Sequence, residues 1–180
     1  MLSFFLLIII GFAAFRGVRR GLAYQAVLTI GYLTVFTVAS KQYVKLIDSL
    51  ELLVPYPQPS LDSKLLYYSG EQLFNLDHYF YAGVSFLIIM LLGWALVRFI
   101  GFFFYELIFI DVFHHVGKIL GGILAVLVTL VTLSCLLNLL AMVPLGFIQQ
   151  MIDQSPLSKI IIEKIPYFSN KIIELWTHVA

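Results

Sequence analysis

The stretch ILGGILAVLVTLVTLSCLLNLL, residues 119–140, contains no charged side chain. As a helix it would rise about 33 Å, and the hydrocarbon core of a bilayer is about 30 Å thick. Lys118 precedes the stretch, and the next charged residue after it is Asp153. Pro144 and Gly146 are of the types that typically end a helix. The sequence therefore predicts a transmembrane helix over about residues 119–142.

The composition of the whole chain agrees with this prediction. Of its 180 residues, 61% are hydrophobic and 12% are charged, and the mean hydropathy is +0.98. Soluble domains carry about 25% charged residues, so this chain has too few of them to face water on all sides. The net charge of +1 argues against nucleic acid as a partner, and Cys135, the single cysteine, excludes a disulfide scaffold. We expect an integral membrane protein whose main contact is the lipid bilayer.

Three further apolar stretches predict three more membrane spans. Residues 1–15 and 21–40 carry no charge, and residues 79–105 contain Arg98 as their only charged residue. An arginine near the end of a span can extend its guanidinium to the membrane surface, so Arg98 is compatible with a spanning helix. No basic residue precedes the first stretch, which argues against a cleaved signal peptide. We predict an all-α integral membrane protein with four transmembrane helices in one domain, residues 1–180.

Two segments outside these spans predict amphipathic helices at the membrane surface. Residues 41–78 begin with a helical pattern in which apolar residues share one face, and three prolines then interrupt it. The C-terminal tail, residues 153–180, alternates isoleucine and leucine with lysine and glutamate. Within the tail, Ser155 followed by Pro156 is typical of the first turn of a helix. The apolar residues that share a face in the first segment are Val44, Ile47 and Leu50.

Basic residues gather in the two short connections between predicted spans. Lysine and arginine in short loops are retained on the cytoplasmic side of bacterial membranes, so we predict that both connections are cytoplasmic. Four crossings then place both termini on the outer side. These cations are also candidates for contact with anionic lipid or with a protein partner. They are Arg16, Arg19 and Arg20 in the first connection, and Arg98 and Lys118 around the second.

Small residues in two of the predicted spans indicate helix-packing surfaces. Gly117, Gly121 and Ala125 are spaced four apart and would form one stripe, which lets another helix backbone approach closely. Gly21 and Gly31 form a looser set that could face this stripe. The stripe could pack within the chain or against another protein, and the spacing does not decide between these alternatives.

Polar residues inside the predicted spans are few. Gln25 and Asn138 are the amides within spans, and an amide in lipid requires a hydrogen-bonding partner on another helix or a route to the interface. A second polar stretch lies between the third and fourth spans. Its acids and histidines raise the alternatives of a metal site or a proton relay, but adjacent histidines point about 100° apart on a helix, which favours a hydrated turn. These residues are Glu106, Asp111, His114 and His115.

No catalytic motif accompanies these residues. The sequence contains no GxSxG, HExxH or phosphate-binding loop, and it has no segment large enough for a soluble catalytic domain. We therefore expect a protein that is not an enzyme and that has no catalytic residue, no metal site and no cofactor.

Two motifs resemble those of the colicin V production protein (CvpA) family of bacterial inner-membrane proteins. The first, RRGLAYQAVLTIGYLTVFTVA, has the family's arginine–glycine pair, polar residue, glycine and final alanine, although the family often has glutamate at the polar position. The second, FHHVGKILGGILA, keeps two family glycines and has Ala125 in place of a third. Phe113 and His114 stand where the family has an Asp–Arg pair. The matching positions are Arg20, Gly21, Gln25, Gly31 and Ala39 in the first motif, and Gly117 and Gly121 in the second.

The resemblance implies a multi-pass protein of the bacterial plasma membrane that is accessory to production or export of a peptide toxin, or to envelope maintenance. It implies no reaction. A membrane protein of a secretion or envelope system would be its partner. The alternative is a channel or transporter subunit that forms a homo-oligomer. Four spans with few polar residues are too few to form a transport pathway in a single copy, so several copies would be needed.

Overall fold

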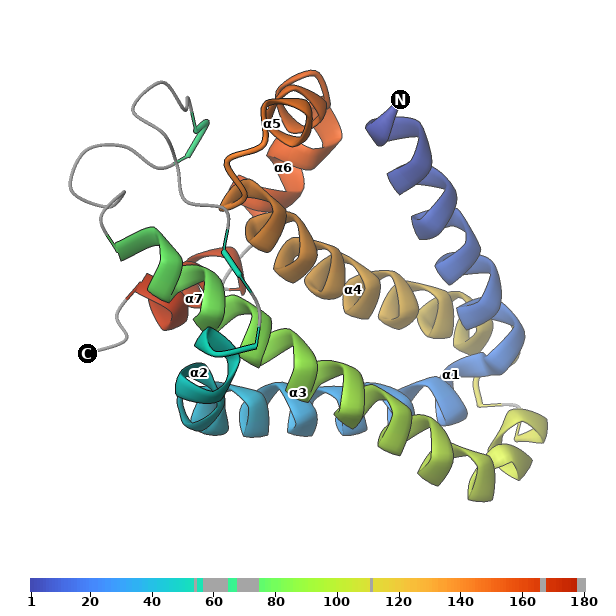
Figure 1. Ribbon diagram of the computed structural model, residues 1–180. Helices are drawn as coiled ribbons and strands as arrows, with labels where there is room; N and C mark the ends of the chain where they lie inside the picture. The colour runs from blue at the N-terminus through green and yellow to red at the C-terminus, as the bar shows by residue number, and fades with distance from the viewer. Residues whose placement is uncertain (54, 57–64, 68–74, 111, 166–167, 178–180) are drawn as a thin grey trace.

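The computed structural model describes residues 1–53, 55–56, 65–67, 75–110, 112–165 and 168–177. Every regular element in these residues is a helix (Figure 1). The elements are α1 (Leu2–Gln42), α2 (Val44–Glu51), α3 (Leu76–Phe103), the 3-10 helix η2 (Tyr105–Phe109), α4 (His114–Ala141), α5 (Gly146–Asp153), α6 (Pro156–Lys164) and α7 (Phe168–Thr177). The all-α prediction is confirmed for this part of the chain.

Three of the described helices are long and apolar enough to cross a membrane: α1, α3 and α4. The last two correspond closely to the predicted spans 79–105 and 119–142. The first two predicted spans, 1–15 and 21–40, both lie within α1, which also includes the basic segment between them.

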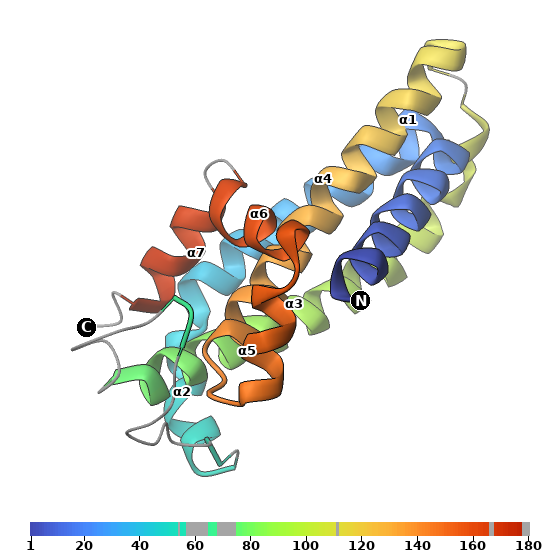
Figure 2. The same ribbon diagram turned by 90° about the horizontal axis from the view of Figure 1, so that it is seen from above.

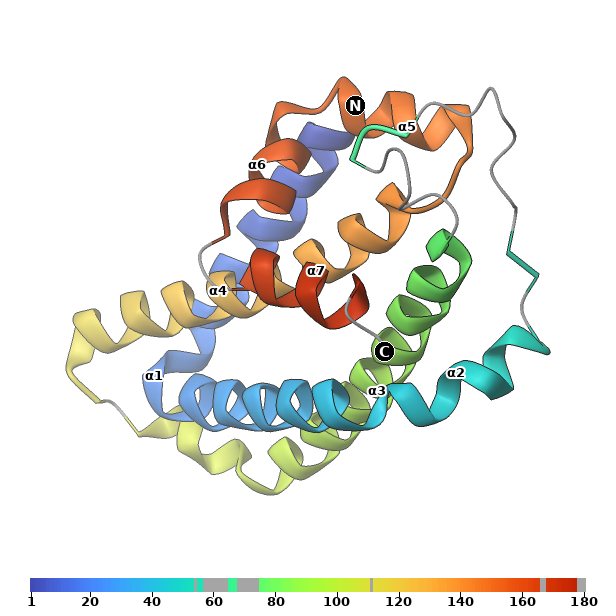
Figure 3. The ribbon, with the colours of Figure 1, turned by 90° about the vertical axis from the view of Figure 1, so that its left-hand side faces the viewer.

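The long helix α1 bends at Gly21, where φ is 72° and ψ is 173°. This backbone conformation is essentially restricted to glycine, because a Cβ atom would clash with the chain itself. The N-terminal half of α1 runs to a corner at Gly21, and the second half leaves that corner in another direction toward α2 (Figures 1 and 3). Gly21 therefore divides one continuous helical segment into two arms.

The second arm of α1 packs on α3, and glycines on both helices accept side chains from the other. A Cβ added at Gly31 would lie 2.8 Å from a methyl group of Val97, and one at Gly93 would overlap Val35. The two arms of α1 with α3 and α4 follow a common diagonal when seen from above, in Figure 2. The long helices thus form one bundle.

The C-terminal helices pack on this bundle with their apolar faces. Ile172 and Trp176 of α7 are fully buried, and the Trp176 ring lies edge-on to Phe86 of α3 at 5.9 Å between centroids. The Tyr43 hydroxyl donates a hydrogen bond to the Leu175 carbonyl. The predicted C-terminal tail therefore turns these apolar side chains toward protein, because the bundle offers them a matching surface.

Helix ends in the same region are satisfied by side chains. The Ser155 hydroxyl accepts a hydrogen bond from the Ser158 amide at 3.2 Å with Pro156 in the first turn, as predicted. Gln149, which the sequence did not single out, donates to the carbonyl oxygens of Ala141 at 3.0 Å and Val143 at 2.9 Å. These bonds occupy carbonyl groups that the end of α4 leaves unpaired.

In the predicted outer segment 41–78, α2 buries Ile47 and Leu50 and leaves Val44 48% exposed. Residues 54, 57–64 and 68–74 of this segment lie outside the described residues.

The Gly21 conformation predicts a strong effect of adding a single methyl group. We expect Gly21→Ala to lower the free energy of unfolding by about 1–3 kcal/mol, because alanine does not tolerate this backbone conformation. Gly11 is the matched control, since a Cβ at either position has no neighbour within 4 Å and only Gly21 has positive φ. Gly11→Ala should leave stability unchanged or raise it by up to about 1 kcal/mol. Thermal unfolding in detergent measures the stability of both variants. Equal unfolding midpoints would contradict the positive φ at Gly21.

Candidate functional site

The first arm of α1 and the beginning of α4 cross at backbone contact. A Cβ added at Gly17 would lie 2.5 Å from both the Gly121 carbonyl oxygen and the Ala125 Cβ. A Cβ added at Gly121 would lie 2.8 Å from the carbonyl oxygens of Gly17 and Gly21. Real Cβ atoms do not approach other atoms so closely, so these positions admit only hydrogen. Small residues thus allow the two backbones to touch, as is common where helices pack in lipid.

The predicted packing residues divide between different partners. Gly21, Gly121 and Ala125 meet at the α1–α4 crossing, whereas Gly31 lies against α3 instead. A side chain at Gly117 would overlap the Val112 carbonyl, so the absence of a side chain here leaves room for the backbone that leads into α4. All three residues of the stripe 117–121–125 thus face α1: Gly121 and Ala125 meet it at the crossing, and a Cβ at Gly117 would lie 3.8 Å from the Leu22 Cβ.

Gly17 is the residue at this crossing that the sequence analysis missed. It forms a Gly-x-x-x-Gly pair with Gly21 in the sequence GVRRG, which is a spacing typical of close helix packing. The two arginines within the pair favour a connection between spans, and this charge signal hides the packing spacing.

The five predicted cations gather at this end of the bundle. The four arginines each lie over an aromatic ring of a neighbouring turn, at 5.5–5.9 Å from the ring centroid. Within the described residues, no carboxylate lies at ion-pair distance from these cations, whereas Lys159–Asp153 and Lys171–Glu174 pair at 2.7 and 3.2 Å elsewhere. The cation–ring pairs are Arg16–Phe12, Arg19–Phe15, Arg20–Tyr24 and Arg98–Trp94.

Arg98 connects α3 to the second arm of α1. Its guanidinium lies near Tyr32 of that arm, and near enough to Arg20 for the two positive charges to repel each other. The Nε atom of Arg98 is buried without a hydrogen-bond partner. Two like charges from different helices therefore meet here, which favours an anion at this end of the molecule.

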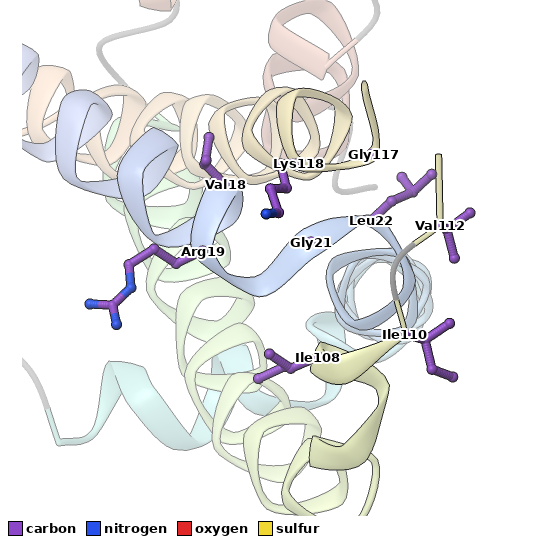
Figure 4. Close-up of a pocket in the computed structure, with 9 residues that line it drawn as sticks. All are labelled: Val18, Arg19, Gly21, Leu22, Ile108, Ile110, Val112, Gly117 and Lys118. Carbon is purple, nitrogen blue, oxygen red and sulfur yellow. The ribbon is translucent and has the colours of Figure 1, made fainter. Parts of the chain in front are cut away.

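A cavity of about 180 Å³ lies between the Gly21 corner and the beginning of α4. On α1 it is lined by Val18, Arg19, Gly21 and Leu22, and on α4 by Gly117 and Lys118, together with residues that precede α4. Figure 4 shows Lys118 extending from α4 toward the α1 ribbon beside Gly21, while the Arg19 guanidinium points away from the cavity. Of the two cations that line this cavity, Arg19 and Lys118, Lys118 is the one whose side chain extends toward Gly21.

The two predicted intramembrane amides are both buried, each 2% exposed. Asn138 donates hydrogen bonds to the carbonyl and hydroxyl oxygens of Ser134, one turn earlier on α4, at 2.8 and 3.3 Å. Its bonds therefore stay within α4. Gln25 on α1 keeps its Oε1 atom buried without a partner, which is energetically costly.

The polar stretch before α4 is described only in part. Asp111 and the His114 side chain lie outside the described residues, while Glu106 and His115 are exposed. In the part of the chain that is described, no three His, Cys, Asp or Glu side chains gather as metal ligands.

The α1–α4 crossing predicts that alanine lowers stability more at Gly17 than at Gly31. At Gly17 the new methyl group would meet backbone atoms of α4, which cannot rotate away, whereas at Gly31 it would meet only the Val97 side chain. We expect Gly17→Ala to lose about 1–3 kcal/mol of stability and Gly31→Ala to lose less. Denaturant titration of both variants in detergent tests this order. A larger loss of stability for Gly31→Ala would contradict the conclusion that the Gly17 contact is tighter than the Gly31 contact.

Comparison with known proteins agrees with the two motifs. The model of the family described as "Colicin V production protein" matches residues 2–166. The chain is also 28% identical over 178 residues to an "Uncharacterized transmembrane protein YshB" of Bacillus subtilis (strain 168), with 98% of each chain covered. No solved structure matches. The family resemblance seen in the sequence is confirmed: the chain is a multi-pass membrane protein and belongs to the colicin V production protein family.

Proposed function

We propose that this protein is a non-enzymatic accessory protein of the bacterial plasma membrane, which acts in the production or export of a peptide toxin and in envelope maintenance. The observation that carries the proposal is the family match, which extends over residues 2–166. Three long apolar helices, α1, α3 and α4, make up much of the described chain, which suits a scaffold inside the membrane.

The proposal includes four membrane crossings, two of them within α1. As helices, residues 2–20 would rise about 28 Å and residues 22–42 about 31 Å, and each length suits a hydrocarbon core of about 30 Å. A straight helix of the 41 residues in α1 would rise about 62 Å, twice that thickness. The bend at Gly21 therefore supports a helical hairpin whose corner lies at one membrane surface.

The distribution of charge supports an orientation with both termini on the outer side. The five clustered cations, Arg16 through Lys118, lie at the corner end, and the positive-inside rule places this end in the cytoplasm. The ion pairs of α6 and α7 and the exposed carboxylates of α2 lie on elements toward the other end (Figure 1).

Cysteine labelling tests this orientation. We introduce a single cysteine at exposed Gln150 of α5 or exposed Glu106 of η2, in a Cys135→Ser background. A membrane-impermeant maleimide applied to intact cells should label Gln150→Cys, and it should label Glu106→Cys only after permeabilisation. The opposite pattern would reverse the orientation, and labelling of both sites in intact cells would contradict the four-span arrangement. Buried Cys135, 1% exposed, should stay unlabelled in the parent chain.

A membrane-embedded face of α3 is available to a partner protein. Trp94, Phe99 and Phe102 are 49%, 65% and 73% exposed in the single chain. In lipid, helices associate through van der Waals contact and interhelical hydrogen bonds. Large aromatic rings supply van der Waals contact. Gly121 is unsuitable for testing assembly, because α1 of the same chain already occupies its surface.

We therefore expect partner contacts on the exposed face of α3. A photo-crosslinking amino acid replaces Phe99 or Phe102 at native expression level, with Leu7 of α1, 57% exposed, as the control position. Crosslinked products are identified by mass spectrometry. A reproducible second protein captured from α3 but not from Leu7 would support the accessory role and name its pathway. Crosslinks only between copies of this chain would instead favour the homo-oligomeric channel and lead to flux measurements in proteoliposomes.

A further inference from the structure

An apolar groove runs along the outside of the α1–α4 crossing. It has a volume of about 300 Å³ and lies between the first arm of α1 and the first half of α4. Its walls include the exposed side chains of Ile123 and Leu127, at 50% and 53%. Residues 119–127 of the α4 wall extend over about 12 Å along the helix. Ala14 and Val18 line the groove on α1, and Ile119, Gly122 and Val126 are among the residues that line it on α4.

A missing side chain shapes the floor of the groove. A Cβ added at Gly122 would lie 2.8 Å from a Val18 methyl group and 3.4 Å from the Ala14 carbonyl oxygen. Any larger residue would fill the space between the helices. Gly122 thus keeps the groove open, whereas Gly121, one position earlier, serves the backbone crossing.

The groove continues into the basic cavity at the Gly21 corner. Val18 lines both hollows, and Lys118 lines the cavity one residue before Ile119, which lines the groove. Figure 4 shows Val18 and Lys118 next to each other where the α1 ribbon approaches α4. The groove and the cavity thus form one continuous apolar groove on the bundle surface, which ends at the Lys118 ammonium group.

We infer that the groove and cavity together hold one anionic phospholipid, with an acyl chain between Val18 and Ile123 and the headgroup phosphate beside Lys118. An acyl chain is thin enough for a groove of this volume, and the phosphate supplies the negative charge that the described residues do not offer to Lys118. A second helix is about 10 Å wide, so it would not enter the groove. The inference rests on the membrane location of the chain and not on its accessory role.

Native mass spectrometry of the full chain tests the lipid preference. The protein is purified in detergent and mixed with phosphatidylglycerol or with phosphatidylcholine that carries the same acyl chains. We expect one retained phosphatidylglycerol per chain and weaker retention of phosphatidylcholine, by about fivefold for one lysine. Both lipids carry the phosphate and they differ in net charge, so equal retention would overturn the preference for an anionic headgroup.

Two variants separate the headgroup contact from the acyl-chain contact. Lys118→Gln should reduce phosphatidylglycerol retention to the phosphatidylcholine level, and exposed Lys41→Gln at the far end of α1 is its control. Ile123→Trp should fill the groove and reduce retention of both lipids. Leu91→Trp on α3, at a position 64% exposed and outside the groove, is the control for the added ring.

Photo-crosslinking locates the bound lipid. Phosphatidylglycerol with a diazirine on its acyl chain should crosslink to the peptide that contains residues 119–127, and Ile123→Trp should remove this product. The inference is rejected if the lipid reacts mainly with other helices, or if Lys118→Gln has no more effect than Lys41→Gln. It is also rejected if a photo-crosslinking residue at Ile123 captures a second copy of the chain.

Discussion

The contact between the backbones of α1 and α4 at Gly17 and Gly121 determines the arrangement of the other helices. In lipid the hydrophobic effect does not distinguish a neighbouring helix from an acyl chain, so close packing must supply the association. Two glycines that face each other permit the helices to approach until the carbonyl of one meets the Cα of the other. The positive φ of Gly21 then directs the second arm of α1 away from this contact and onto α3.

The same corner concentrates charge. Arg16, Arg19 and Arg20 precede the bend, and Lys118 begins the partner helix, so the close crossing brings four cations to one end. Each of the three arginines lies over an aromatic ring, which offsets part of their mutual repulsion. Electrostatics and packing therefore depend on the same few residues.

The helices could be predicted from the sequence because length and hydropathy suffice to identify a spanning segment. The order and the contacts of the helices could not be predicted in the same way. Trp176 reads as part of an amphipathic surface tail, yet it is buried against Phe86, because only the assembled bundle creates the surface that accepts it. Gly31 and Gly121 both indicate helix packing, but their spacing does not name the helix that each one meets, and in the structure Gly31 faces α3 whereas Gly121 faces α1.

The positions of the buried polar groups bear on the choice between a scaffold and a channel. A conducting pathway requires polar or charged groups along a continuous opening through the membrane. The two hollows of about 180 and 300 Å³ meet at Val18 beside the basic end, and neither is lined by Gln25 or Asn138. Asn138 satisfies its amide within α4, so it offers these hydrogen bonds to no passing solute. On the outer face, α3 presents aromatic rings, and such a face suits contact with protein or lipid better than contact with water.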